Sequence, residues 1–326
     1  AEDPAMIVAR AEEALQFLAT HRQKPFFLYL ALTIPHANNE AGRHGMEVPD
    51  LGAYADKEGW PEPQKGQAAM IARMDRDVGR ILDALRRLKI DRRTLVVFTS
   101  DNGGVSAGDA FSTSNLPLRG GKGIEYEGGT REPYYIRWPE KVKPGTNATP
   151  VTGTDFYPTI LEACGLPLRP DQHADGVSLM PLLSGGEIEK RPLFWHYPHY
   201  SNQGGEPVSM IVEGDWKLIE DLEDGSLRLY NVAEDIGEQN DLSQDEPDRT
   251  KAMAESLKEW KSEIDAGKMV ENPNFDPAKY AKQIEQAHTV KKRQLETFHQ
   301  NLVYPPSELK SDEPVTYQSS AFRIKK

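Results

Sequence analysis

The segment that spans residues 94–131 constrains this chain more than any other part of its sequence. It opens with an apolar, β-branched run at 95–98, which the oxygen-bearing neighbours Asp101 and Asn102 follow. Lys122 comes later and is flanked only by glycines. A buried strand that ends in oxygen donors presents them at the carboxyl edge of a sheet, where a hard cation can bind. The sequence therefore predicts a metal site with a lysine nearby for an anionic substrate.

Simpler explanations exist for the same residues. Asn-Gly after an apolar run is a common hairpin turn, but only scattered apolar residues lie between Gly103 and Asn115, so no second strand is expected there. The EF-hand pattern fails at Gly103, where it needs an oxygen-bearing side chain, and the P-loop pattern fails at Gly123, where it needs Ser or Thr. For Lys122, a solvated lysine in a flexible loop stays open as the alternative.

Composition and charge exclude several kinds of partner. With 326 residues, of which 38% are hydrophobic, the chain can bury a core. A net charge of -12 argues against nucleic acid, which is bound by clustered Lys and Arg. No apolar run approaches the roughly 18 residues of a membrane span. The first residues have neither the basic nor the apolar part of a signal peptide, so any such signal is expected upstream of Ala1.

Helix and strand patterns alternate through the first part of the chain. Apolar residues recur at helical spacing over 7–18 and 70–85, and buried-strand runs stand at 26–30 and 95–98. Strand, helix and strand in this order predict a right-handed parallel crossover. We expect a further strand at 134–138 and a helix near 159–163.

After Arg191 the pattern changes to short strands. Runs at 208–212, 216–220 and 227–230 are separated by turn signals, and an amphipathic helix over 253–264 is expected to pack on the resulting antiparallel sheet. We predict an α/β fold in which a mixed, largely parallel sheet is sandwiched by helices over 1–190. A smaller α+β subdomain built on an antiparallel sheet follows over 191–272, and then a polar tail over 273–326.

The Asp101–Asn102 pair, the glycine-flanked Lys122 and the run from Glu127 to Arg131 resemble the formylglycine-dependent type I sulfatases of the alkaline phosphatase superfamily. The resemblance covers about residues 1–275 and implies an alkaline phosphatase-like fold, incomplete at the amino-terminal end. It implies that Asp101 and Asn102 hold a Ca²⁺ ion that also touches the sulfate, and that Lys122 contacts a sulfate oxygen. Such an ion takes about 6 to 8 oxygens, so further ligands must come from elsewhere.

His36 follows the apolar run at 26–30 and its extension to Pro35. A histidine just past a buried strand is often only structural. In the sulfatase resemblance the imidazole contacts the sulfate ester, where it can donate a hydrogen bond or protonate the leaving oxygen. The chain departs from many members at Thr33, where they carry a second histidine.

The nucleophile motif of the family, Cys/Ser-x-Pro/Ala-x-Arg, is absent from the sequence. After Cys164, the only cysteine, Pro167 and Arg169 each come one position too late, and no serine fits the motif. Cys164 ends a predicted helix, so we expect it to be buried in packing. Formylglycine is therefore expected in an upstream segment, and this chain alone is expected to be inactive.

Residues 195–200 alternate aromatic side chains with His196 and His199 and lead into a glycine-rich stretch. A half-buried strand would explain this alternation. Aromatic faces with a few directed donors also bind sugars, and the segment resembles the one that leans over the active-site mouth of polysaccharide sulfatases. We assign His196 and His199 to substrate binding.

These residues predict a sulfuric ester hydrolase that acts at a calcium site on sulfated carbohydrate, an aryl sulfate or another small organic sulfate, in the periplasm or outside the cell. A phosphodiesterase or phosphatase of the same superfamily is the alternative, which the few scattered histidines disfavour. An inactive sulfated-sugar-binding fragment, or one piece of a split enzyme, stays open, and so does the oligomeric state.

Overall fold

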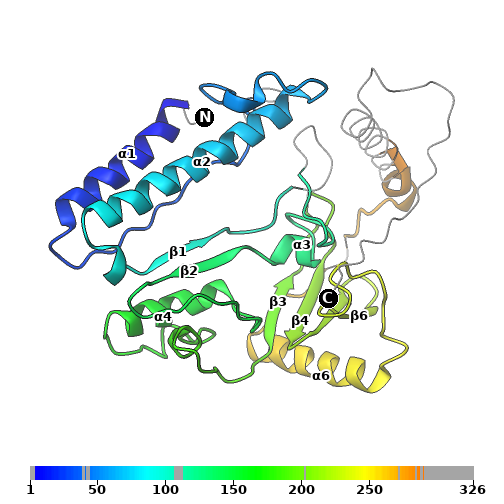
Figure 1. Cartoon of the computed structure of the whole chain (residues 1–326). Helices are drawn as coiled ribbons and strands as arrows, with labels where there is room; N and C mark the ends of the chain where they lie inside the picture. The colour runs from blue at the N-terminus through cyan, green and yellow to red at the C-terminus, as the bar shows by residue number, and fades with distance from the viewer. Residues whose placement is uncertain are drawn as a thin grey trace.

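The computed structural model describes residues 4–38, 41, 45–105, 113–201, 203–270, 272–282, 285, 286 and 289. Two long helices, α1 (Pro4–His21) and α2 (Glu62–Arg87), lie beside a sheet of β1 (Val96–Thr99) and β2 (Tyr134–Arg137) (Figure 1). A four-stranded sheet follows, made of β3 (Leu193–Tyr197), β4 (Val208–Glu213), β5 (Trp216–Asp221) and β6 (Leu227–Asn231), with α6 (Pro247–Glu263) on one face. The short elements are η2 (Gly52–Tyr54), η3 (Asp91–Arg93), α3 (Glu127–Thr130), η4 (Gly153–Asp155), α4 (Phe156–Ala163) and α5 (Met180–Leu183).

One apolar cluster joins α1, α2 and β1. Its buried members are Leu18, Ala84, Leu85 and Ile90, and Leu15, Phe26, Leu28 and Val96 are among the residues that pack around them. Helical spacing puts the apolar residues of each helix on one face, and burial of a single leucine contributes about 1.5 to 3 kcal/mol. The helices predicted at 7–18 and 70–85 are confirmed.

The parallel crossover predicted from 26–30 through α2 to β1 is wrong. Residues 26–30 form no strand, and among the described residues β1 pairs only with β2, in antiparallel fashion. The run is also not buried on both faces: Phe26 and Leu28 join the helical core, but Phe27 is 68% exposed and Tyr29 81%. An apolar run does not fix a strand by itself, because its backbone groups need a hydrogen-bonded neighbour.

The antiparallel sheet and helix predicted after Arg191 are confirmed, and β3 adds a fourth strand. The strand order is β3-β4-β5-β6. Gly214 and Gly225, with φ of 60° and 74°, occupy the tight turns, where a left-handed conformation favours glycine. On the face toward α6, the sheet residues Ile211, Leu218 and Leu229 are buried against Met253 and Leu257 of the helix. Trp260 of α6 stacks on Phe194 with 4.8 Å between ring centroids.

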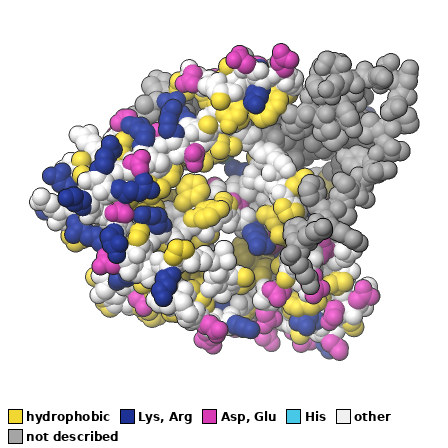
Figure 2. All heavy atoms as spheres, in the orientation of Figure 1, with side chains coloured by type: hydrophobic (Ala, Val, Ile, Leu, Met, Phe, Trp, Pro, Cys, Tyr) yellow, Lys and Arg dark blue, Asp and Glu magenta, His cyan; other side chains and the backbone are white. Residues whose placement is uncertain are grey.

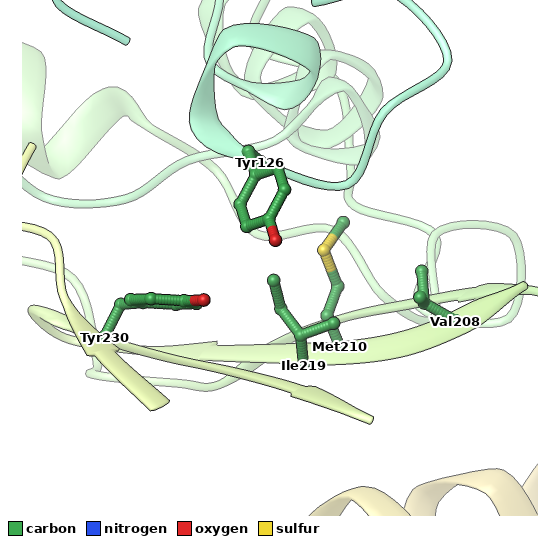
Figure 3. Close-up of a cluster of buried hydrophobic side chains, with 5 residues drawn as sticks. All are labelled: Tyr126, Val208, Met210, Ile219 and Tyr230. Atoms are coloured by element: carbon green, nitrogen blue, oxygen red, sulfur yellow. The ribbon is translucent and has the colours of Figure 1, made fainter. Parts of the chain in front are cut away.

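The opposite face of this sheet carries a second apolar cluster, which contains a residue from outside the sheet. Figure 3 shows Tyr126, which immediately precedes α3, pointing onto Met210, Ile219 and Tyr230. The Tyr126 and Tyr230 rings pack edge to face, with 6.1 Å between their centroids. The segment that carries Lys122 is therefore anchored on the sheet through its neighbour Tyr126.

Cys164 is exposed, so its predicted burial is wrong. It is the C-cap residue of α4, and Gly165 ends the helix with φ of 68°. A residue at the end of a short helix lies beyond the face that Leu161 buries. Although Cys164 is exposed, the residues that follow it still do not match the nucleophile motif.

Charged side chains are spread unevenly over the surface. In Figure 2, Lys and Arg gather at the left, over the helical pair, and acidic side chains gather at the lower right, near α6. No helix among the described residues is long and apolar enough to cross a membrane. Most of the polar tail predicted over 273–326 lies outside the described residues.

Candidate active site

His36 and Lys122, which are distant in the sequence, meet in the structure. Lys122 Nζ lies 3.3 Å from His36 Nε2. Lys122 is half-buried and His36 is exposed, so a ligand can reach the pair from solvent. A point charge beside an imidazole is suited to an anionic group that has several oxygens.

The hydrogen bonds of His36 assign its tautomer. Nδ1 lies 2.7 Å from the carbonyl oxygen of Ala37, which can only accept, so Nδ1 carries a proton. Nε2 then has a lone pair and accepts a hydrogen bond from the Lys122 ammonium group. Because Nε2 faces Lys122, a proton placed on Nε2 would lie beside any ligand that contacts Lys122.

Asp101 and Asn102 lie just beyond the end of β1. Asp101 Oδ1 accepts a long hydrogen bond from Ser100 Oγ at 3.4 Å. Asn102 Nδ2 donates to the carbonyl oxygen of Gly103 at 3.1 Å, so the amide NH₂ is engaged and the side-chain oxygen remains to serve as a ligand. One carboxylate and one amide oxygen are the donor types that a hard cation such as Ca²⁺ prefers.

Backbone contacts connect the loop after β1, residues 100–104 (the Asp101–Asn102 loop), to residues 118–125 (the Lys122 loop). The amide of Lys122 donates to the carbonyl oxygen of Gly104 at 3.0 Å. Asn115 bridges the same two loops: Nδ2 donates to Gly104 O at 2.8 Å and to Gly120 O at 3.1 Å, and Oδ1 accepts from Gly104 N at 3.2 Å. Sequence reasoning did not select Asn115, because nothing in its local pattern shows that it spans two loops.

Glu132 is a second acidic residue that sequence reasoning missed. Thr99 pairs with Tyr134 at the end of the β1–β2 ladder, and two residues further on Asp101 and Glu132 leave the same ladder. Burial, and after it the charge of Asp101, raise the pKa of Glu132. Its Oε1 is buried without a hydrogen-bond partner among the described residues. The carboxyl group thus adds acidic character beside the predicted metal loop.

The segment assigned to the substrate divides into two parts. His196 lies in the half-buried strand β3, as the simpler explanation expects, and both its ring nitrogens contact the protein, at 2.8 Å from Ser209 Oγ and 2.8 Å from Gly267 O. His199 lies beyond β3 and is exposed, with its ring edge to face with Tyr197. The geometry therefore offers His199, more than His196, to a ligand.

The glycine-rich turn that follows His199 packs on the Lys122 loop. A β-carbon on Gly205 would lie 1.9 Å from the carbonyl oxygen of Gly123, so only glycine permits this approach. The turn is closed by the amide of Ser201, which donates to Gly205 O at 2.9 Å, and by Ser201 Oγ, which donates to Gln203 Oε1 at 2.8 Å. The predicted recognition segment and the predicted sulfate-binding lysine are thus neighbours.

The two arginines near Lys122 are engaged within the protein. Arg119 lies over the Tyr126 ring, 3.7 Å from its centroid, and donates to the carbonyl oxygen of Glu238 at 2.6 Å. Arg131 pairs with Glu127 at 3.6 Å, although 54% of its side chain is exposed. Of these three cations, Lys122 is therefore the one that is left for an anion.

Comparison with known proteins places the chain among its relatives. A family model described as Sulfatase matches residues 7–166, and one described as N-sulphoglucosamine sulphohydrolase, C-terminal, matches residues 121–266. The chain belongs to the sulfatase family. The sulfatase models together span both sheets and the loops that carry Asp101 and Lys122.

Curated relatives of this sulfatase-family chain are longer than it is. A sulfatase of Formosa agariphila is 33% identical over 264 residues, which cover 72% of the chain and 46% of the relative. An N-acetylgalactosamine-6-sulfatase of Canis lupus familiaris is 34% identical over 211 residues, which cover 63% and 36%. The chain therefore spans about half the length of the relatives it matches, or less.

Solved structures give the same result for the fold. The chain matches Ps i-CgsB in complex with k-i-k-neocarrahexaose at 29% identity with a TM-score of 0.63, over 78% of this chain and 54% of that one. The mixed α/β arrangement of this sulfatase-family chain is thus shared with that solved structure.

Proposed function

We propose that the complete protein is a sulfuric ester hydrolase that acts on sulfated carbohydrate, and that His36 and Lys122 bind the sulfate group. The observation that carries this proposal is the 3.3 Å contact between the two side chains beside the Asp101–Asn102 loop. The relatives support the substrate class, because one is named an N-acetylgalactosamine-6-sulfatase and a solved neighbour holds a neocarrahexaose.

The two side chains have separate tasks in this proposal. The ammonium group of Lys122 contacts a sulfate oxygen and offsets the negative charge that develops on the leaving oxygen as the S–O ester bond breaks. His36 Nε2 accepts a hydrogen bond from Lys122 in the structure, so it must first take up a proton, from the Lys122 ammonium group or from water, before it can give one to the leaving oxygen. The attacking group, formylglycine, is expected in a segment outside these 326 residues, because no Cys or Ser here stands in the nucleophile motif.

Calcium is the proposed cofactor, and the residues present fit it in part. Asp101 and Asn102 supply two oxygens of the right type, out of the about 6 to 8 that Ca²⁺ takes. The described residues contain no group of three or more His, Cys, Asp or Glu that could hold a metal ion. The remaining ligands would therefore come from other parts of the complete protein. When bound, the ion would supply positive charge to a sulfate oxygen.

Recognition of the sugar is assigned to His199 and the turn that follows it, because this turn packs on the Lys122 loop. His196 is retained as a lesser candidate, since both its ring nitrogens already have partners. A sulfated polysaccharide is met outside the cytoplasm, so the periplasm or the cell exterior is the proposed location.

The test compares ester classes with the complete protein. A chromogenic aryl sulfate should be hydrolysed, and the matching aryl phosphate and phosphodiester should be poor substrates. This chain alone should hydrolyse none of them. Preferential hydrolysis of the phosphate esters would support the phosphatase alternative. Binding of a sulfated glycan by the complete protein without turnover would support an inactive binding protein.

A further inference from the structure

Strand β5 carries a buried cation that the proposed chemistry does not use. Lys217 of β5 has a side chain that is 0% exposed. Its Nζ donates to Glu127 Oε1 at 3.3 Å and lies 3.0 Å from Glu238 Oε1. A buried ammonium group needs such partners, because desolvation of an unpaired charge is very costly. Three parts of the chain thus contact this ammonium group or carry it: the four-stranded sheet of β3 to β6 (the C-terminal sheet), α3 and the loop after β6.

Glu238 and Glu127 are held to each other as well as to Lys217. The amide of Glu127 donates to Glu238 Oε2 at 2.7 Å, and Arg119 donates to the carbonyl oxygen of Glu238 at 2.6 Å. Glu127 also pairs with Arg131 at 3.6 Å. The four side chains Lys217, Arg131, Glu127 and Glu238 carry two charges of each sign, so the group is neutral as a whole.

Helix α3 connects this ion group to both loops of the candidate site. The amide of Gly128 donates to Arg119 O at 2.7 Å, at the start of the Lys122 loop. The carbonyl oxygen of Gly129 accepts from the amide of Gly103 at 3.2 Å, in the loop after Asn102. A β-carbon on Gly103 would lie 1.8 Å from the carbonyl oxygen of Gly128, so this approach has no spare room.

Apolar packing alone does not fix the position of α3. Tyr126 seats the segment on the sheet (Figure 3), but apolar contact is not directional. The ion group supplies direction, since Lys217 holds the side chain of Glu127 and Glu238 holds its amide. A shift of α3 would therefore be passed to Gly103 and to Arg119 together.

We propose that Lys217 is a positioning residue: by holding α3 through Glu127 and Glu238, it sets the place of Lys122 relative to the Asp101–Asn102 loop. The C-terminal sheet then contributes to the chemical step as well as to recognition of the sugar. The kinetic part of this inference rests on the proposed function. The structural part does not.

The kinetic test compares a variant with an unpaired buried charge with a variant in which the charges balance, so that an effect on stability can be told apart from an effect on positioning. Lys217→Met leaves two buried carboxylates with one cation. Lys217→Met combined with Glu238→Gln leaves Arg131 with Glu127, which is balanced, and the amide oxygen of the introduced glutamine can still accept from the backbone amide of Glu127. Replacement of a buried ion pair by neutral groups of similar size is often tolerated. We expect the double variant of the complete enzyme to regain most of the melting temperature that the single variant loses.

In the double variant, kcat on an aryl sulfate should nevertheless stay about 10- to 100-fold below the wild-type value, because small misplacements of binding groups lower the rate. Lys261→Met is the matched control, since it breaks the pair with Glu220 on the same strand without touching α3. It should leave kcat unchanged. Recovery of kcat together with the melting temperature in the double variant would overturn the inference. If the double variant does not fold, Glu127→Gln is the substitute: Lys217 keeps Glu238, the largely exposed Arg131 is left to solvent, and loss of the hold on the Glu127 side chain should still lower kcat.

Hydrogen exchange of this chain tests the structural part without any activity. Peptides that cover 100–105 and 119–131 contain the amides of Gly103, Lys122 and Gly128. They should exchange about tenfold faster in the double variant, whereas a peptide from β4, which carries neither substitution, should not change. Unchanged exchange in both site peptides would refute the positioning role. If the complete protein hydrolyses no sulfate ester, the proposed function fails, and the exchange result still decides the role of Lys217.

Discussion

At the scale of single residues, burial separates the tasks that we propose for the two lysines. Lys122 is half-buried, and within the described part of the chain its ammonium group contacts a neutral imidazole acceptor. Lys217 is fully buried between two carboxylates. A cation with its carboxylate partners in place is held as structure, whereas one that faces an uncharged ring can take up an anion.

Asp101→Ala should abolish the dependence of stability on calcium in the complete protein. A ligand that binds only the folded state raises stability by RT ln(1 + [L]/Kd), so loss of one charged ligand removes this term. The measurement is the melting temperature with and without Ca²⁺. Asp171→Ala, at an exposed position away from the loop, is the control and should keep the full shift. A normal calcium shift in Asp101→Ala would place the metal elsewhere.

Glu238 gives the unfolding free energy a pH dependence of known sign. Burial raises the pKa of Glu238, although Lys217 and the amide of Glu127 act in the opposite direction. The Glu238 carboxyl group therefore stays protonated to higher pH in the folded protein than in the unfolded chain. The stabilisation is complete below the unfolded pKa, near 4.5, and is lost as pH rises through the folded pKa.

Glu238→Gln removes this titration. The unfolding free energy of the wild type minus that of the variant should therefore fall as pH rises from about 4 to about 7. Urea unfolding at a series of pH values measures this difference. Glu187→Gln, at an exposed site, should show no such trend. A difference that stays constant or rises with pH for Glu238→Gln would contradict the assignment.

At the scale of elements, patterns within one segment predicted well and pairings between segments did not. The helical spacing over 70–85 became α2, and the runs around Gly214 and Gly225 became an antiparallel sheet, because helix periodicity and tight turns are local properties. The run at 26–30 has the composition of a strand, but it forms none. Its outcome depends on a hydrogen-bonding neighbour that the run itself does not encode.

The contact between the glycine-rich turn and the Lys122 loop can be tested at Gly205. A β-carbon there would meet Gly123 O at 1.9 Å, so Gly205→Ala must push the two segments apart. We expect a loss of about 1 to 3 kcal/mol in unfolding free energy, as for other overpacked sites. Gly145→Ala has open space around it and should cost little. Equal unfolding free energies for the two variants would show that the turn does not depend on this approach.

At the scale of the whole molecule, the sequence selected candidate residues for the site but did not reveal the framework that holds them. Motif resemblance selected His36 and Lys122, and the structure brings them together. Asn115, Lys217 and Glu238 were missed, since each acts through contacts with residues far away in the sequence. Such contacts exist only once the C-terminal sheet has packed against α3.

Two variants can separate the chemical step, proposed for Lys122, from recognition of the sugar, proposed for His199. Lys122 is assigned to the sulfate group, which every substrate shares. In the complete enzyme, Lys122→Ala should therefore lower kcat/KM for an aryl sulfate and for a sugar sulfate alike. The loss of a charge-assisted contact in a dry site is worth roughly 3 to 4 kcal/mol, or about 10² to 10³ in rate. Lys143→Ala, at an exposed position, is the control and should change neither value.

His199→Ala should behave differently, because His199 stands on the segment assigned to the sugar. It should spare the aryl sulfate and penalise only the sugar sulfate, by about 1 to 3 kcal/mol if a polar group of the substrate loses its partner. Steady-state kinetics of both variants on both substrates make the comparison. Equal losses for His199→Ala on the two substrates would place this histidine in the chemical site, and the C-terminal sheet would then supply a group to the reaction itself.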